Sequence, residues 1–235
     1  MDLNNYYSTS DSKFQFTRQQ ASKFAKNIAG DFNPIHDQDN KRFCVPGDLL
    51  FSLVLQHYGI SEKMNFEFGG MVADQIPLQF IETENQQINI CDEKEKVYLT
   101  VQRSGKKTEN SELINNLVQA YVGFSGQTFP HVLVPLMKQH NKMINPDRPL
   151  VIYNNMLIDI NDLNISNPTL KLVNSNLDID GKRGNVCLKF HIIQEGNIVG
   201  SGEKNMVLSS LRDFEEDKIA QLVESYDLRK NTITE

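Results

Sequence analysis

Asp31 and His36 are the two residues of this chain whose types and spacing best suit acid–base chemistry. They lie on either side of the turn dipeptide Asn33-Pro34. A carboxylate and an imidazole that a turn brings together can share one water molecule and move its proton near neutral pH. Asn33 is expected to shape the turn and is a candidate substrate contact. The alternative interpretation is a plain turn, in which both side chains bond to the backbone.

Gly47 and Asp48 are further candidates, because they stand where an almost wholly apolar segment, residues 49–55, begins. Asp48 as N-cap and Gly59 as C-cap predict a helix, with a buried strand as the alternative. A helix that is apolar on all sides lies inside a protein, and this one is too short to cross a bilayer. Its first N–H groups have no intrahelical partner, so we expect Gly47 to bind a developing negative oxygen, such as that of a thioester becoming an enolate.

The elements that must position these residues begin with a helix. Thr17 and Gln20 have the spacing of a capping box, and apolar residues then recur at helical intervals as far as Ile28. Gly30 stands where a C-cap is expected. The polar segment 31–44 then predicts a loop, because the residue before a proline avoids helical geometry.

Beyond the apolar segment, alternation of apolar and polar residues predicts strands. The alternation runs over residues 97–102 and 118–124, with a polar turn at 104–110 between them. After a break at 123–130, a helix is predicted over 133–140, with Pro135 in its first turn or at a kink. Four more strands are predicted at 150–160, 170–179, 186–193 and 198–208. A last helix is expected to open at Asp213 and Glu216.

A helix followed by several antiparallel strands therefore occurs twice along the chain. This order predicts an α+β fold in which a sheet wraps over the apolar helix. We place the internal boundary between residues 127 and 128, so that residues 1–127 carry the Asp31/His36 pair and residues 128–235 carry the terminal helix.

Composition excludes several classes of protein. With 39% hydrophobic and 23% charged residues over 235 positions, the chain can bury a core and is not a disordered polymer. A net charge of −6 disfavours duplex nucleic acid and anionic membranes as partners. Cys44, Cys91 and Cys187 form neither a disulfide framework nor a zinc motif. Without a leader or a membrane span in the pattern, we expect a cytoplasmic protein that needs no metal or cofactor.

Residues 24–36 resemble the hydratase motif of the MaoC-like, (R)-specific enoyl-CoA hydratase family. That pattern reads Ser-Gly-Asp-x-Asn-Pro-Ile/Leu-His, followed by a His-Gly pair at the start of a central helix. The matching residues here are Asp31, Asn33, Pro34, His36 and the glycine of the pair, Gly47. Ala29 replaces the serine, Pro46 replaces the histidine of the pair, and the connecting loop is short. Over its whole length, the chain is also similar to an uncharacterised bacterial family related to these hydratases.

The resemblance implies a double hotdog fold, with a catalytic motif only in the N-terminal half. It implies that Asp31 and His36 activate water while the Gly47 N–H holds the oxygen of an acyl thioester of coenzyme A or acyl carrier protein. A homodimer remains open. Two other functions are compatible with Pro46, Asp48 and the short loop. One is a non-catalytic acyl-binding module, and the other is a thioesterase that uses Asp48 or Asp31.

Overall fold

The structure of the protein is a computed structural model that describes residues 1–83 and 85–233. Within these residues, ten strands form one antiparallel sheet in the order β1-β2-β4-β5-β6-β3-β8-β11-β10-β9. The N-terminal strands are β1 Ser8–Ser10, β2 Lys13–Gln15, β3 Ile60–Phe68, β4 Leu78–Glu82, β5 Ile88–Asp92 and β6 Val97–Thr108. The C-terminal strands are β8 Val151–Ile160, β9 Thr169–Asp180, β10 Arg183–Gln194 and β11 Asn197–Ser209. The molecule is thus α+β, as predicted.

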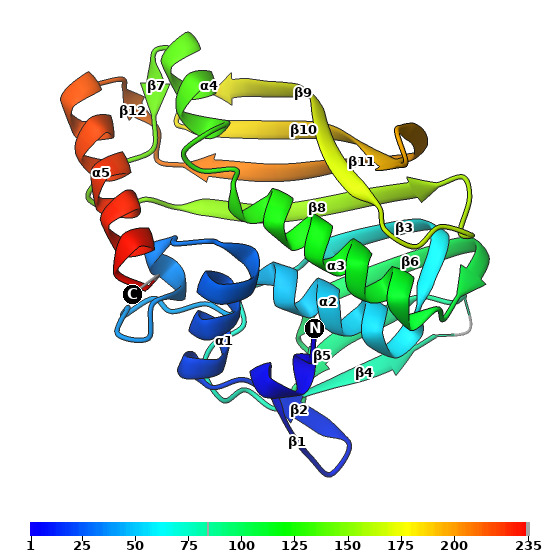
Figure 1. Ribbon diagram of the computed structural model, residues 1–235. Coiled ribbons are helices and arrows are strands. Elements are labelled where there is room, and N and C mark those ends of the chain that lie inside the picture. The colour runs from blue at the N-terminus through cyan, green and yellow to red at the C-terminus, as the bar shows by residue number, and fades with distance from the viewer. Residues whose placement is uncertain (84, 234–235) are drawn as a thin grey trace.

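The helices pack against this sheet and at its end (Figure 1). They are α1 Arg18–Phe24, α2 Gly47–Tyr58, α3 Ser111–Gly126, α4 Leu133–Gln139 and α5 Glu216–Ile233. A small second sheet pairs β7 Lys142–Met143 with β12 Arg212–Asp213. Among the described helices, none is both long enough and apolar enough to span a bilayer.

Helix α1 starts at the predicted capping box. The Thr17 hydroxyl accepts the Gln20 N–H at 3.2 Å, and the Gln20 side-chain oxygen accepts the Thr17 N–H at 3.0 Å. The helix continues as a π-helical turn, Ala25–Ala29, and ends at Gly30, whose φ of +64° is left-handed. Glycine adopts this conformation without steric cost, so the chain can turn sharply into the Asp31 loop.

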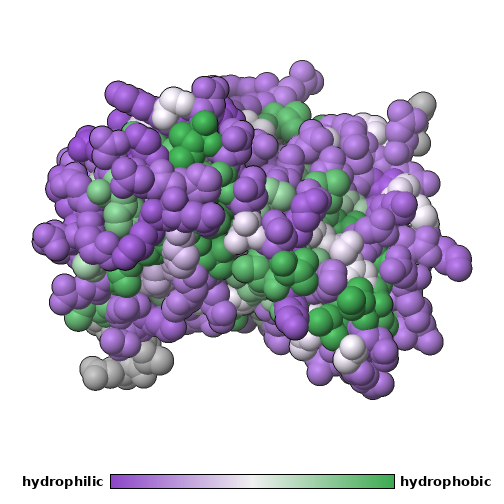
Figure 2. Space-filling view, turned by 90° about the horizontal axis from the view of Figure 1, so that it is seen from above, coloured by the Kyte–Doolittle hydropathy of each residue, from purple (hydrophilic) through white to green (hydrophobic). Residues whose placement is uncertain are grey.

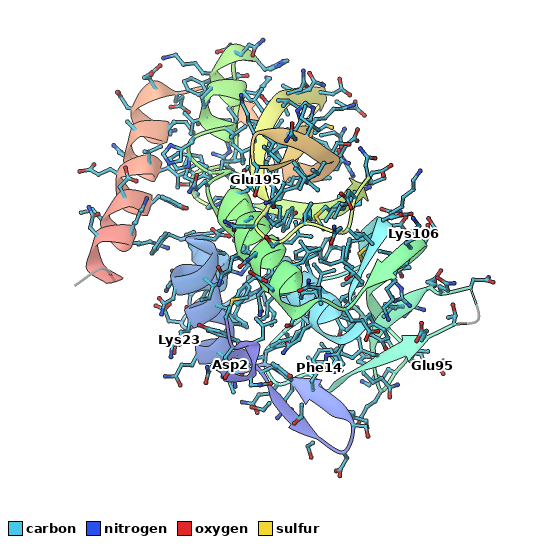
Figure 3. All side chains as sticks on the ribbon, turned by 45° about the vertical axis from the view of Figure 1, so that its right-hand side comes forward. Asp2, Phe14, Lys23, Glu95, Lys106 and Glu195 are labelled. Atoms are coloured by element: carbon cyan, nitrogen blue, oxygen red, sulfur yellow. The ribbon has the colours of Figure 1, made fainter. Side chains whose placement is uncertain are left out.

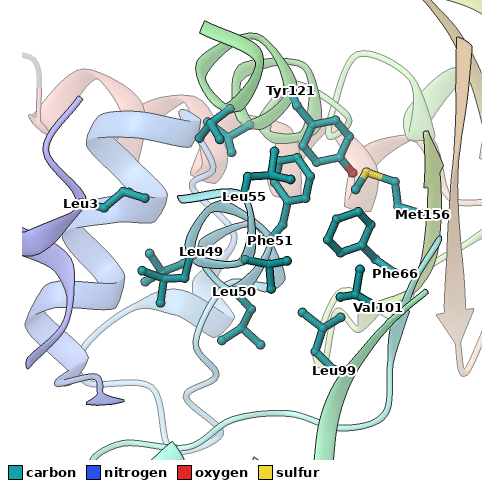
Figure 4. Close-up of a cluster of buried hydrophobic side chains, with 14 of the residues drawn as sticks. Leu3, Leu49, Leu50, Phe51, Leu55, Phe66, Leu99, Val101, Tyr121 and Met156 are labelled. Carbon is teal, nitrogen blue, oxygen red and sulfur yellow. The ribbon is translucent and has the colours of Figure 1, made fainter. Parts of the chain in front are cut away.

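Helix α2 is the apolar helix that the sequence predicts, and it is buried along most of its length. Leu49, Leu50, Phe51 and Leu55 are all at most 2% exposed. Figure 4 shows their side chains leaving the helix in several directions, with Phe66, Leu99 and Val101 of the sheet on one side and Tyr121 on another. A helix surrounded in this way needs apolar residues on every face.

Helix α3 corrects the strand predicted at residues 118–124. The helix begins after Asn110, whose side-chain oxygen accepts the N–H groups of Glu112 and Leu113 at 2.9 and 3.3 Å. Its buried residues recur at helical intervals. The alternation that predicted a strand arose because some positions of this helical face are also two residues apart. The buried residues are Leu113, Ile114, Leu117, Val118, Tyr121, Val122, Ser125 and Gly126. The turn predicted at 104–110 is also wrong, because β6 continues to Thr108.

The other predicted helices and strands are confirmed, except that Asp213, predicted to open the last helix together with Glu216, lies in strand β12. Strands β8, β9, β10 and β11 cover the four predicted C-terminal strands, α4 has Pro135 in its first turn, and α5 begins at Glu216. The β10–β11 hairpin turns at Glu195 and Gly196, which have φ values of +51° and +82° as a tight hairpin turn requires. Strand β3 pairs with β8 from Lys63↔Asp159 to Glu67↔Asn155, and this contact makes the sheet continuous.

Side chains fill the space between the helices and the sheet (Figure 3). The larger of two buried apolar clusters surrounds α2 and α3, and the smaller lies among α4, α5 and the C-terminal strands. Seen from above, the surface is mostly hydrophilic with scattered hydrophobic patches (Figure 2). Helix α5 and the segment after α1 lie next to each other at one end of the molecule, where the candidate site is found (Figure 1).

Candidate active site

One cavity of about 290 Å³ is lined by every residue that the sequence nominated for chemistry. Asp31, Asn33 and His36 contribute from the loop after α1, and Gly47 and Asp48 contribute from the start of α2. The C-terminal part of the chain supplies other walls of the same cavity through β8, β11 and α5. Residues that are far apart in sequence therefore meet in one hollow.

The turn that carries Asp31 and His36 is held by its own side chains. Asp31 Oδ1 accepts the Asn33 N–H at 2.8 Å, and Asn33 Oδ1 accepts the Ile35 N–H at 3.1 Å. A 3-10 turn, Pro34–His36, follows Asn33. Because its oxygen caps this turn, Asn33 has a structural role, and its contact with substrate stays a prediction. Only Oδ1 of Asp31 takes part in this turn, which leaves Oδ2 free to interact with another group.

That group is His36, whose Nε2 lies 3.6 Å from Asp31 Oδ2. His36 Nδ1 lies 2.7 Å from the carbonyl oxygen of Cys44. Since a carbonyl oxygen can only accept, Nδ1 carries the proton, and in the neutral ring Nε2 keeps a lone pair. Two acceptors do not bond each other directly, but one water molecule can donate a hydrogen to each. The gap between Asp31 Oδ2 and His36 Nε2 can therefore accept a bridging water molecule.

Gly47 is the first residue of α2 and follows Pro46, which provides no side-chain cap. The Leu49 N–H bonds the Pro46 carbonyl at 3.0 Å, whereas the Gly47 N–H, at the first position of α2, has no intrahelical acceptor. A β-carbon at position 47 would lie 2.9 Å from Phe68 Cε1 and 3.1 Å from Tyr153 Cδ1, which is too close for a side chain. The glycine thus lets two aromatic rings pack against the helix start.

Asp48 is not the N-cap that the sequence predicts. It lies in the first turn of α2, is only 7% exposed, and its Oδ2 accepts a hydrogen bond of 2.5 Å from the Ser125 hydroxyl. Burial raises the pKa of Asp48, while the positive charge of Lys204 opposes that rise. The carboxylate points into the protein, where the Ser125 hydroxyl bonds it and the positive charge of Lys204 favours its ionised form. Its role as a substrate contact stays a prediction.

Lys204 and Ser125 are site residues that the sequence analysis missed. Lys204 Nζ donates a hydrogen bond to Ser125 Oγ and lies 4.7 Å from the centre of the Tyr153 ring. Only 4% of Lys204 is exposed, and this burial lowers its pKa against the pull of Asp48. The alternation of β11 could have revealed Lys204, because it lies on the same buried side of the strand as Gly202 and Met206. Ser125 was missed because it falls in the break predicted at 123–130, where the structure has the end of α3.

Tyr226 of α5 ties the C-terminal helix to the Asp31 loop. Its hydroxyl accepts the Phe32 N–H at 3.4 Å and lies 3.2 Å from the carbonyl oxygens of Gly30 and Gly126, either of which can accept its proton. Burial, and then the charge of Asp31, raise the pKa of Tyr226 to about 12, so the hydroxyl stays protonated. The helix thus holds the segments on both sides of Asp31 in place.

Replacing Tyr226 by Phe should lower the free energy of unfolding by about 1–3 kcal/mol, because buried groups that the hydroxyl pairs would lose their partner. Urea denaturation followed by circular dichroism measures the change. The matched control is Tyr7→Phe, which removes an exposed hydroxyl bonded to Asn4 Oδ1 and should stay within about 0.5 kcal/mol of the unchanged protein. An equally small effect of Tyr226→Phe would show that α5 is not anchored through this group.

Asp37 fastens the loop just after His36. Its two carboxylate oxygens lie 2.8 Å from Lys26 Nζ and 2.8 Å from Arg229 Nη1, so one side chain joins the segment after α1 to α5. A carboxylate that bridges two cations from different elements restricts the movement of the loop. Together with Tyr226, it makes α5 part of the wall around the Asp31/His36 pair.

Cys44 borders the cavity, but its thiol is not a reactive nucleophile. Burial raises the pKa of its thiol to about 12, so almost no thiolate exists near neutral pH. Its backbone carbonyl, rather than its sulfur, serves the site by orienting His36. Among the described residues, no three His, Cys, Asp or Glu side chains gather as a metal site would require.

The profile of a protein family described as DUF3581, protein of unknown function, matches residues 1–217. This chain belongs to that family. The matched range includes the Asp31 loop, α2, Ser125 and Lys204, so all the polar groups of the cavity named above, except Tyr226 and Arg229 of α5, lie within it. No curated protein sequence matches the chain.

Several solved structures are similar to this chain at low sequence identity. An acyl-CoA thioesterase II, TesB2, from Mycobacterium marinum is 9% identical with a TM-score of 0.47, covering 92% of this chain and 99% of that one. A MaoC-like dehydratase is 8% identical with a TM-score of 0.44, covering 88% and 99%. A conserved hot dog fold protein from Alicyclobacillus acidocaldarius is 8% identical with a TM-score of 0.45, covering 88% and 97%.

Proposed function

We propose that this protein is a hydratase that adds water to a trans-2-enoyl thioester and, in reverse, dehydrates a 3-hydroxyacyl thioester. The carrier is coenzyme A or acyl carrier protein. One observation carries the proposal: Asp31 Oδ2 and the lone-pair nitrogen of His36 lie 3.6 Å apart on the wall of a cavity that also contains the start of α2. The resemblance of this loop to the hydratase motif supports the same chemistry.

The two side chains divide the work of activating water. A water molecule that donates one hydrogen to Asp31 and one to His36 points an oxygen lone pair away from both, toward a substrate. As the oxygen attacks C3 of the enoyl group, His36 accepts a proton and the Asp31 carboxylate stabilises the imidazolium. The proton then passes to C2, so that water has been added across the double bond and both residues return to their starting forms.

The negative charge that develops on the thioester oxygen needs a donor. The Gly47 N–H at the positive end of α2 supplies one, because the first amides of a helix are free and the dipole favours an anion there. Pro46 cannot compete for this amide with a capping side chain. Gly47 therefore holds the enolate oxygen while the C2 proton is added.

We also propose that the fold is a double hotdog, divided between residues 127 and 128. The apolar helix α2 packed within an antiparallel sheet supports the N-terminal unit, and the β3–β8 pairing would be the junction of two sheets. Helix α3 precedes this boundary, yet Tyr121 and Phe124 contact the ring of Phe190 on β10. Helix α3 therefore packs against both units, since Tyr121 also contacts Phe51 of α2.

The test is a direct assay of hydration. Purified protein is mixed with trans-2-enoyl-CoA esters of short, medium and long chain, and loss of the enoyl absorbance is followed while a thiol reagent reports released coenzyme A. Loss of absorbance without thiol release supports the proposal. Thiol release would instead assign hydrolysis, for which Asp48 in the first turn of α2 or Asp31 is the candidate base. No change with either coenzyme A or acyl carrier protein esters would leave a binding module.

A further inference from the structure

Helix α5 contacts the Asp31 loop on both sides of the Asp31/His36 pair, and Tyr226 makes the first of the two contacts. The Tyr226 hydroxyl accepts the Phe32 N–H at 3.4 Å and lies 3.2 Å from the carbonyl oxygen of Gly30. These two backbone groups belong to the residues directly before and after Asp31. The Tyr226 ring packs edge-on against Phe32, with 5.8 Å between the ring centres. Tyr226 therefore fixes the backbone from which the Asp31 carboxylate projects.

Gly30 explains why the loop needs a contact of this kind. Its φ of +64° is left-handed, and a β-carbon there would meet no atom within 4 Å. A loop that begins at an unpacked glycine has more conformational freedom than other loops, so it needs further contacts to keep one conformation. The Asp31 N–H bonds the Ala25 carbonyl oxygen at 2.8 Å, which joins the loop to the preceding helix. Tyr226 adds a connection to the C-terminal part of the chain.

The second contact lies directly after His36. Arg229, on the turn of α5 that follows Tyr226, places Nη1 2.8 Å from Asp37 Oδ2. Lys26 Nζ lies 2.8 Å from the other oxygen of the same carboxylate. The Lys26 and Asp37 side chains are each 19% exposed, and ion pairs that are partly shielded from water are weakened less by salt than exposed ones. Arg229 therefore fixes the residue that follows His36.

The two contacts matter because little else of α5 is buried. Among the α5 residues whose side chains the structure describes, only Ile219 and Tyr226 are buried, at 4% and 7% exposed. Ile219, with the half-buried Leu222 and Val223, packs into the smaller apolar cluster beside the C-terminal strands. Helix α5 is thus anchored in that cluster near its start and joined to the Asp31 loop farther along (Figure 1).

The distance of 3.6 Å between Asp31 Oδ2 and His36 Nε2 has to be maintained for a water to bridge them. Such a water needs hydrogen bonds of about 2.8 Å to both atoms, so a shift of about 1 Å at either one breaks the bridge. We infer that α5, through Tyr226 and through the Arg229–Asp37 ion pair, holds Asp31 and His36 at the separation that a bridging water requires. This inference rests on the proposed function for the reaction it serves, and it assigns Tyr226 and Arg229 as positioning residues.

Hydrogen exchange of backbone amides tests the inference without depending on turnover. Exchange at residues 30–37 is followed by mass spectrometry in the unchanged protein, Tyr226→Phe and Arg229→Gln. Phenylalanine keeps the ring that packs on Phe32, and glutamine keeps a polar side chain without the charge. Both variants should speed exchange at residues 30–37 about tenfold or more, because the loop opens locally once a contact is lost.

Two control variants separate this effect from others. Lys138→Gln removes an exposed ion pair of 2.8 Å that joins Glu216 of α5 to α4 instead of to the loop. Ile192→Val removes a buried methyl group of β10 outside the cavity lining, so it lowers stability without touching α5 or the loop. Each control should leave exchange at residues 30–37 within about twofold of the unchanged protein, since local opening does not depend on distant packing.

The kinetics of enoyl-CoA hydration give a second readout. Tyr226→Phe and Arg229→Gln should each lower kcat about tenfold or more and leave KM within about threefold, since a misplaced base slows the chemical step. Arg229→Lys should recover most of the lost rate, because it keeps a cation opposite Asp37. In a protein that already carries Asp37→Asn, Arg229→Gln should lower kcat no further, because Arg229 acts through that carboxylate.

Unchanged exchange at residues 30–37 in both variants overturns the inference, and so does an equal acceleration by Ile192→Val. A higher KM at an unchanged kcat also overturns it, because Tyr226 and Arg229 would then act as substrate contacts. If the unchanged protein hydrates no enoyl thioester, faster exchange confined to Tyr226→Phe and Arg229→Gln still supports the positioning of the pair by α5. Only the proposed reaction fails in that case.

Discussion

Replacing Asp31 by Asn should lower kcat/KM for enoyl-CoA hydration at least about 100-fold, because it removes one of the two acceptors that hold the water. The asparagine oxygen can still accept the Asn33 N–H, so the turn keeps its shape. The amide nitrogen would replace the oxygen that lies 3.6 Å from His36 Nε2. As a donor, it would bond the lone pair of Nε2 directly and block the base.

The rate of absorbance loss at substrate concentrations well below KM measures this effect. Asp39→Asn is the matched control, because Asp39 belongs to the same loop but is exposed and lies outside the cavity lining. It should keep activity within about twofold of the unchanged protein, as surface substitutions usually do. Hydration by Asp31→Asn at a third or more of the original rate would remove Asp31 from the mechanism.

Replacing Gly126 by Ala should destabilise the protein by about 3 kcal/mol or more, since overpacking against backbone cannot be relieved by turning a side chain. A β-carbon at position 126 would overlap the Ala29 carbonyl group, with its carbon only 2.8 Å away, and would lie 3.1 Å from the Asp31 nitrogen. The end of α3 and the start of the Asp31 loop approach so closely that only glycine fits. Any folded fraction should therefore also have a displaced Asp31 and lower activity.

Urea denaturation of Gly126→Ala and Gly123→Ala makes the comparison within one helix. A β-carbon at position 123 meets no atom within 4 Å. Gly123→Ala should therefore stabilise the protein by up to about 1 kcal/mol, because alanine is the better helix former. If the two variants were equally stable, α3 would not pack against the loop as described.

Local sequence patterns were enough to predict most of the helices and strands and the turn that carries Asp31 and His36. The capping box of Thr17 and Gln20 and the left-handed Gly30 depend only on neighbouring residues, and both were read correctly. The same holds for the turn that places Asp31 near His36, because Asn33 closes it with its own side chain. Interactions within a few residues leave a readable pattern, since the residue types and their spacing are the cause of the structure.

Sequence patterns failed where the same apolar residues fit a helix and a strand equally well. Val118 and Val122 fit alternation as well as they fit a helical face, and only the packing of α3 beside α2 settles which is formed. Asp48 likewise looked like a cap, because the sequence contains no sign that Ser125 lies 2.5 Å away. Residues 77 positions apart met there through the tertiary fold alone.

By itself, the sequence determined the turn that brings Asp31 near His36, the apolar helix after it and most strands of an α+β fold, because each depends on contacts within one turn or one element. The tertiary structure alone decided that Asp48, Ser125 and Lys204 share a buried polar cluster and that α5 closes the wall through Tyr226. Burial and charge pairing arise only once distant segments pack. The walls and charges of this cavity therefore depend on the whole fold, whereas the turn that brings Asp31 near His36 depends on one loop.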